Sequence, residues 1–107
     1  MNLNQLEYFV SAAEHLNFTR AAKQCYISQT AMTQQMQALE KALGVQLFLR
    51  DKRRIELTPA GTVYLKEARA ILKRSDEAMR LARMASTGTD GEITIGFVSG
   101  FGQSDGY

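Results

Sequence analysis

Five side chains with amide or hydroxyl groups recur at helical spacing over positions 29–37, and they could hydrogen-bond to the edges of nucleic-acid bases. They are Gln29, Thr30, Thr33, Gln34 and Gln37. On an ideal helical wheel they span an arc of about 140°, while the apolar Met32, Met36, Leu39 and Leu43 fall within about 60° on another arc. Uncharged donors and acceptors of this length can read bases in the major groove, where every base pair presents a distinct pattern. The plainer alternative is that these side chains only solvate an exposed helix.

The segments around this polar face predict three helices, two of which are joined by a short turn. Apolar residues at three-to-four spacing indicate a first helix over 3–16, and a second helix is expected over 19–24 and a third over 28–43. The candidate N-caps are Asn2 or Asn4, Thr19 and Ser28, and Gly44 supplies a left-handed stop. Only 25–27 separates the second helix from the third, which predicts a helix-turn-helix in which Tyr26 takes the place where glycine is common.

A basic cluster follows the third helix. Residues 50–54 carry four positive charges and one negative, between the β-competent segments 45–50 and 55–57, so we expect a small hairpin, or wing. The cations at its tip could grip phosphates or enter a narrow minor groove; they are Lys52, Arg53 and Arg54. Arg50 could equally pair with an acidic neighbour, and the wing could be a plain solvated turn. Other phosphate contacts are expected at the starts of the second and third helices, from Thr19, Arg20 and Ser28.

The pair Thr58-Pro59 predicts the start of a long fourth helix, which ends near Ala85. Apolar and small residues recur in it at heptad spacing and predict a dimerisation stripe: Tyr64, Ala68, Ile71, Leu72, Ser75, Ala78, Met79 and Ala82. A rod of roughly 40 Å is long for packing only on its own domain, so pairing with a second copy is favoured over that alternative. The basic residues of this helix are interpreted as solvent-facing flanks.

Composition excludes several classes of protein. The 107 residues include one cysteine, Cys25, and one histidine, His15, so we expect no disulfide framework, no metal site, no cofactor and no enzymatic activity. Cys25 is expected to be a small buried residue, and a redox switch there is a third possibility besides DNA binding and catalysis. No apolar run is long enough to span a bilayer and the start of the chain is not a signal sequence, which predicts a cytoplasmic protein.

These elements predict a mainly α fold: a winged helix-turn-helix with three helices and a two-stranded wing, followed by a long dimerisation helix. The expected division is a DNA-binding domain over 1–58, a linker and dimerisation helix over 59–87, and a hinge with a first strand over 88–107. The strand, 92–98, has no partner in the sequence, which suggests that the chain is a fragment of a longer protein. Residues 99–107 receive no assignment.

The order and spacing of many short motifs resemble the LysR-type family of bacterial transcriptional regulators. The resemblance covers positions 1–98 and rests on 18–22 (FTRAA), 27–29 (ISQ), 39–40 (LE), 43–48 (LGVQLF), Arg50 and 57–61 (LTPAG). It implies sequence-specific binding of double-stranded DNA and transcriptional regulation, with an antiparallel pair of long helices in a homodimer. It also implies a tetramer in full-length members and a small-molecule effector bound by a separate domain.

Two departures from the family pattern bear on specificity. The family often has Pro where this chain has Thr30, and commonly Ser-Arg where it has Thr33-Gln34. An amide in place of a guanidinium suits adenine better than guanine, so the preferred sequence is expected to differ. A dimer predicts an inverted-repeat target. The alternative is a winged-helix module of another regulator family that binds DNA or protein.

Overall fold

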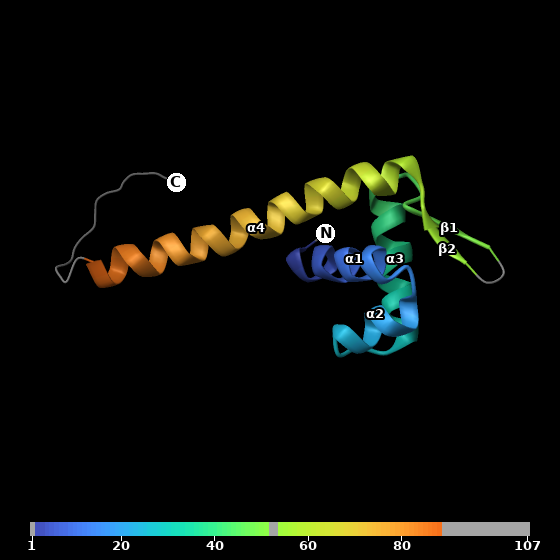
Figure 1. Ribbon diagram of the computed structural model, residues 1–107, viewed down its shortest axis with the longest axis horizontal. Coiled ribbons are helices and arrows are strands. Elements are labelled where there is room, and N and C mark those ends of the chain that lie inside the picture. Colours follow the sequence, from blue (N-terminus) through green and yellow to red (C-terminus); the bar gives the residue numbers. More distant parts are fainter. Residues whose placement is uncertain (1, 52–53, 89–107) are drawn as a thin grey trace. The chain divides into compact units, whose positions relative to one another are not determined.

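The computed structural model describes residues 2–51 and 54–88, and these residues form four helices and one two-stranded sheet (Figure 1). In chain order the elements are α1 (Leu3–His15), α2 (Phe18–Gln24), α3 (Gln29–Leu43), β1 (Phe48–Arg50), β2 (Ile55–Leu57) and α4 (Pro59–Gly88). This order confirms the predicted fold class of a winged helix-turn-helix followed by a long helix. The predicted strand over 92–98 lies outside the described residues.

Capping residues set where the first two helices begin. Asn2 caps α1, since its side chain accepts a hydrogen bond from the N–H of Gln5 at 2.8 Å. The prediction that Thr19 caps the second helix is wrong. Asn17 caps α2 by accepting from the N–H of Arg20 at 2.9 Å, because its extended backbone (φ −157°) directs the side chain to that amide. Thr19 therefore lies within the first turn of α2.

The turn between α2 and α3 follows the local signals. Ser28 caps α3 by accepting from the N–H of Ala31 at 3.0 Å, and Gly44 ends the helix at φ 74°. Tyr26 adopts φ 61°, the left-handed region in which glycine is favoured, as expected from its place in the turn. These features confirm the helix-turn-helix and the bounds of its second helix.

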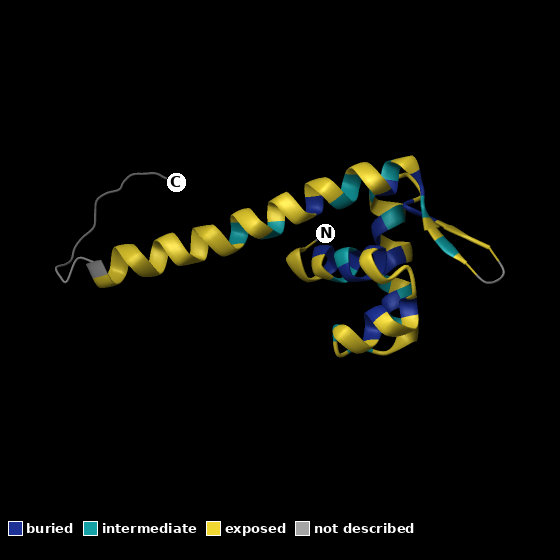
Figure 2. Cartoon of the chain, in the orientation of Figure 1, coloured by how far each residue is buried: buried dark blue, intermediate teal, exposed yellow. Residues whose placement is uncertain are grey.

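One core holds the three short helices, the sheet and the start of α4 together. Met32, Met36 and Leu39 on α3 are fully buried, as the helical wheel predicts. The centre of the Phe48 ring of β1 lies 5.2 Å from the centre of the Phe18 ring and 5.5 Å from that of the Phe9 ring. Phe48 thus anchors the sheet to α1 and α2. Figure 2 colours the buried residues of the chain dark blue.

The sheet is a tight antiparallel hairpin in which Phe48 pairs with Leu57 and Arg50 with Ile55. Its first strand begins at Phe48 and is shorter than the predicted 45–50. The reason is the register: Phe48 already pairs with the last residue of β2, because α4 begins at Pro59, so the preceding residues have no strand partner. The amides of Leu47 and Phe48 instead donate to the Glu40 carboxylate of α3, at 2.8 and 3.1 Å. The wing predicted from the sequence is therefore present and is attached to α3.

The start of α4 is joined to the sheet by Thr58. Its hydroxyl donates to the carbonyl of Gln46 at 2.7 Å and accepts from the N–H of Gly61 at 2.9 Å, which confirms the predicted helix start. By its internal contacts the chain divides into a unit that ends at Leu72 and another that begins at Lys73. In the first unit Tyr64 packs 5.2 Å from the Phe9 ring, and burial raises the pKa of its phenol.

Candidate nucleic-acid interface

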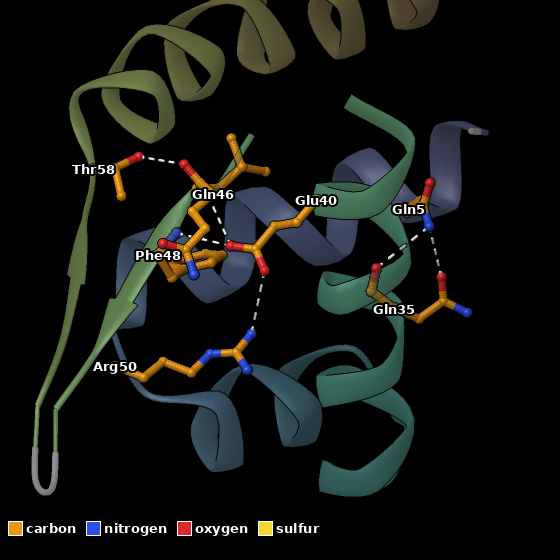
Figure 3. A network of polar contacts seen from close by, with 8 residues as sticks. Gln5, Gln35, Glu40, Gln46, Phe48, Arg50 and Thr58 are labelled. Atoms are coloured by element: carbon orange, nitrogen blue, oxygen red, sulfur yellow. Dashed lines mark hydrogen bonds and ion pairs between the residues drawn. The ribbon is translucent and has the colours of Figure 1, made fainter. Parts of the chain in front are cut away.

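The polar side chains of α3 point away from the core. Gln29, Thr30, Gln34 and Gln37 are exposed, and Thr33 is half-buried. The neighbouring Gln35 faces α1 instead, because the Gln5 side chain donates to its side-chain and backbone oxygens at 3.2 and 3.4 Å (Figure 3). All five predicted residues therefore remain available to a ligand, and Gln35 holds α3 against α1.

An open groove of about 550 Å³ lies between the starts of α2 and α3 and the wing. Its lining includes Asn17, which caps α2, Thr19 of α2, Gln29 and Thr33 of α3, and Arg50, Asp51 and Arg54 of the wing. Of the predicted site residues, the groove thus brings together Thr19, Gln29, Thr33 and Arg54. Those that do not line it are Arg20, Ser28, Thr30, Gln34 and Gln37. The groove combines neutral donors and acceptors with guanidinium groups, which suits a strand of nucleic acid with its phosphates.

The starts of α2 and α3 supply further polar groups. Thr19, Arg20 and Ser28 are all exposed. The Ser28 hydroxyl accepts from the N–H of Ala31, and its own proton remains able to donate to an oxygen of a ligand. Asn17 was not predicted from the sequence as a site residue. Its available signal was that asparagine is a favoured N-cap and that it directly precedes the second helix. Asn17 lines the groove and also caps α2.

The cations of the wing differ in their surroundings. The Arg50 guanidinium lies 3.7 Å from the Glu40 carboxylate and 5.0 Å from the centre of the Phe18 ring, so the acidic partner considered from the sequence is present. Arg54 lies 3.7 Å from the Glu56 carboxylate, with both side chains more than half exposed. Such an exposed pair is weak and leaves Arg54 able to turn to a phosphate. Lys52 and Arg53 lie outside the described residues.

The proposed dimerisation stripe divides into a covered and an uncovered part. Ala68 has no exposed surface in a single chain, and Tyr64 and Leu72 are half-buried against the core. Ile71, Ala78, Met79 and Ala82 are exposed, and Ser75 is half-buried. In the first turns of α4 the stripe therefore packs on its own domain. The length of the helix had favoured pairing with a second copy over this packing. The residues of the stripe that a single chain leaves most exposed are Ile71, Ala78, Met79 and Ala82.

The two residues considered for other chemistry have ordinary surroundings. His15 is exposed and its Nε2 lies 3.1 Å from the side-chain oxygen of Gln24. Cys25 is half-buried rather than fully buried, and it packs against the core. Within 2–51 and 54–88 no group of three or more His, Cys, Asp or Glu residues could hold a metal ion.

In the same described residues, no helix has both the length and the apolar character needed to cross a membrane.

Comparison with known proteins gives one consistent family. Residues 3–62 match the family of bacterial regulatory helix-turn-helix proteins of the lysR type. The chain is 45% identical over 98 residues to the Hca operon transcriptional activator HcaR of Escherichia coli, and 39% identical over 98 residues to the regulator AlsR of Bacillus subtilis. Each alignment covers 92% of this chain but 33% and 32% of the relative, so the chain spans about a third of their length.

Solved structures agree with these relatives. A crystal structure of the CbnR DBD in complex with DNA has a TM-score of 0.78 at 45% identity, covering 80% of this chain and 99% of that one. The BenM DBD in complex with catB site 1 DNA has a TM-score of 0.79 at 34% identity, covering 82% and 95%. Both similar proteins were crystallised with DNA.

Proposed function

Because this chain belongs to the lysR family of bacterial regulatory helix-turn-helix proteins, we propose that it binds double-stranded DNA sequence-specifically as a dimer and regulates transcription. The observation that carries the proposal is the outward polar face of α3, which is distinct from the face that is fully buried at Met32, Met36 and Leu39. Such a helix can enter a major groove without losing core contacts. A protein with this function acts where the bacterial chromosome lies, in the cytoplasm.

Base reading is assigned to the exposed face of α3, with Gln29 and Thr33 foremost because they line the groove. Thr30, Gln34 and Gln37 complete this set. Positioning on the phosphate backbone is assigned to Thr19, Arg20 and Ser28 at the helix starts and to Lys52, Arg53 and Arg54 of the wing. The proposed division is a DNA-binding domain over 1–58, a linker and dimerisation helix over 59–87, and a hinge with a first strand over 88–107.

Selection of duplexes from a random pool tests this function directly. The bound sequences should converge on an inverted repeat, because two copies of α3 related by a two-fold axis read the two half-sites. A pool that shows no enrichment would favour the alternative of a winged-helix module that contacts protein.

Affinity for the selected duplex should fall by about 1,000-fold or more between 50 and 200 mM salt, because the proposed cations of a dimer release many counterions from the phosphates. Fluorescence anisotropy titrations at several salt concentrations measure the slope. Arg20→Gln should flatten it, whereas Arg83→Gln on α4, also an exposed arginine, should leave it unchanged. A flat response of the unaltered chain would contradict phosphate binding.

Dimerisation is assigned to the uncovered part of the stripe on α4, where Met79 is 49% exposed although it is apolar. Ala82→Glu should weaken the dimer by about 100-fold, because it buries an unpaired charge in the interface. Sedimentation equilibrium measures the dissociation constant. Ala70→Glu is the matched control, since Ala70 is exposed on a different side of the same helix. Equal dissociation constants for the two variants would remove this stripe from the interface.

A further inference from the structure

A single carboxylate joins α3 to the wing. Glu40 lies in the last turns of α3, and its side chain is only 14% exposed. One carboxylate oxygen accepts the amides of Leu47 and Phe48 at 2.8 and 3.1 Å, and the other lies 3.7 Å from the Arg50 guanidinium (Figure 3). Two backbone amides and one guanidinium, all from β1 or the residue just before it, therefore converge on one side chain of α3.

These contacts satisfy groups that water does not reach. Leu47 and Phe48 are buried, and a buried amide without an acceptor is strongly unfavourable. The carbonyl of Leu47 accepts a hydrogen bond from the N–H of Thr58 at 3.0 Å. The start of the wing is therefore bonded to α3 through Glu40 and to Thr58, the residue that directly precedes α4. Glu40 is thus the side chain of α3 that satisfies both buried amides at the start of the wing.

The same carboxylate reaches a third element through Arg50. The Arg50 guanidinium lies over the ring of Phe18, the first residue of α2, at 5.0 Å from its centre. Phe18 and Arg50 both line the groove that also contains Thr19, Gln29 and Arg54. Glu40 is therefore connected to each of the three elements that border the groove.

We propose that Glu40 is a positioning residue of the DNA interface: it holds the wing and the start of α2 at the separation from α3 that lets one duplex contact all three. The inference rests on the DNA-binding function proposed above. Glu40 itself does not contact DNA in this proposal. Its negative charge beside the interface would by itself repel phosphates, so its presence there favours a role in geometry over a role in electrostatics.

The sign of one substitution separates these roles. Glu40→Gln removes a negative charge, which by electrostatics alone should tighten DNA binding. If Glu40 positions the wing, the affinity of the 107-residue chain for the selected duplex should instead fall by roughly tenfold, the effect of one or two misplaced contacts. Glu56→Gln on β2 is the matched control. It removes the same charge from the wing, where Glu56 forms an exposed ion pair with Arg54, and the variant should bind as tightly as the unaltered chain or tighter.

A double-mutant cycle distinguishes positioning from general damage. In a background with Lys52, Arg53 and Arg54 all changed to alanine, Glu40→Gln should lose less affinity than it does in the unaltered chain, because the wing contacts that Glu40 positions are already absent and only those at the start of α2 remain to be misplaced. In a Gln29→Ala background the full loss should persist. Hydrogen exchange at the amides of Leu47 and Phe48 should accelerate in Glu40→Gln without loss of helix content.

Each outcome decides one question. Failure of the unaltered chain to bind any duplex would reject the proposed function itself. Tighter or equal binding by Glu40→Gln, or an equal loss in both backgrounds, would overturn only the positioning role. If Glu40→Gln does not fold, Arg50→Lys replaces it in the cycle, since it keeps the charge but loses the planar group over Phe18. It should lose affinity about threefold in the unaltered chain, and less where the wing cations have been removed.

Discussion

Changing Gln29 and Thr33 together to alanine should weaken binding to the selected duplex by about 100-fold, and binding to a random duplex by less than about threefold. Both side chains line the groove beside the wing. A good bidentate base contact discriminates by about 1–3 kcal/mol, whereas non-specific affinity comes from phosphate contacts that the variant keeps. Anisotropy titrations of both duplexes at one salt concentration measure the two losses.

The matched control changes the same two residue types away from the groove. Gln46→Ala with Thr87→Ala alters exposed positions, and both duplexes should be bound as by the unaltered chain. Equal losses on the two duplexes in the Gln29 and Thr33 variant would show that these residues do not read bases. The specificity of the chain would then have to reside in the other α3 residues or in the shape of the DNA.

Gly61→Ala should destabilise the chain by about 3 kcal/mol or more, although alanine is normally the better residue within a helix. A Cβ atom at this position would overlap the carbonyl oxygen of Leu47 and would lie 2.9 Å from a methyl carbon of Leu57. The first contact is with backbone, so α4 and the start of the wing would have to separate. Thermal unfolding followed by circular dichroism should show a fall in Tm of about 12 °C or more.

Gly44→Ala is the control for this experiment because it introduces strain without a clash. Gly44 has φ 74°, but a Cβ added there would meet no atom within 4 Å apart from the glycine itself and its two chain neighbours. Its expected loss is about 1–2 kcal/mol, which is the penalty for an ordinary residue in the left-handed region. A Gly61→Ala chain that unfolds at or above the Tm of the Gly44→Ala chain would contradict the close approach of α4 to Leu47.

Local signals were sufficient for the helix-turn-helix because each of them acts within one turn of chain. Ser28 caps α3 through an amide three residues away, and Gly44 ends it by its own backbone angle. The polar and apolar faces of α3 follow from the 3.6-residue period once the helix exists. The same reasoning chose Thr19 over Asn17 as the cap of α2, since the sequence offers two acceptable caps and only the backbone angle decides between them.

The contacts of the wing could not be predicted at the same level. The sequence suggested an acidic partner for Arg50 without identifying it, and nothing in it assigned the amides of Leu47 and Phe48 to Glu40. These contacts form only when the turn after Gly44 brings the chain back beside α3. Their physical origin is the requirement that buried amides find acceptors, which depends on which amides become buried.

By itself the sequence determined the helices, the turn that joins two of them, the exposed polar face of α3 and the presence of a wing, because these depend on neighbours within a few residues. Only the tertiary structure decided how the heptad stripe of α4 is used. Ala68 and Ala82 belong to the same repeat, yet Ala68 is fully buried in its own domain and Ala82 is exposed. A periodic apolar stripe predicts that one side of a helix will be covered. Because the hydrophobic effect is non-directional, the stripe does not specify whether its own domain or a second chain covers it.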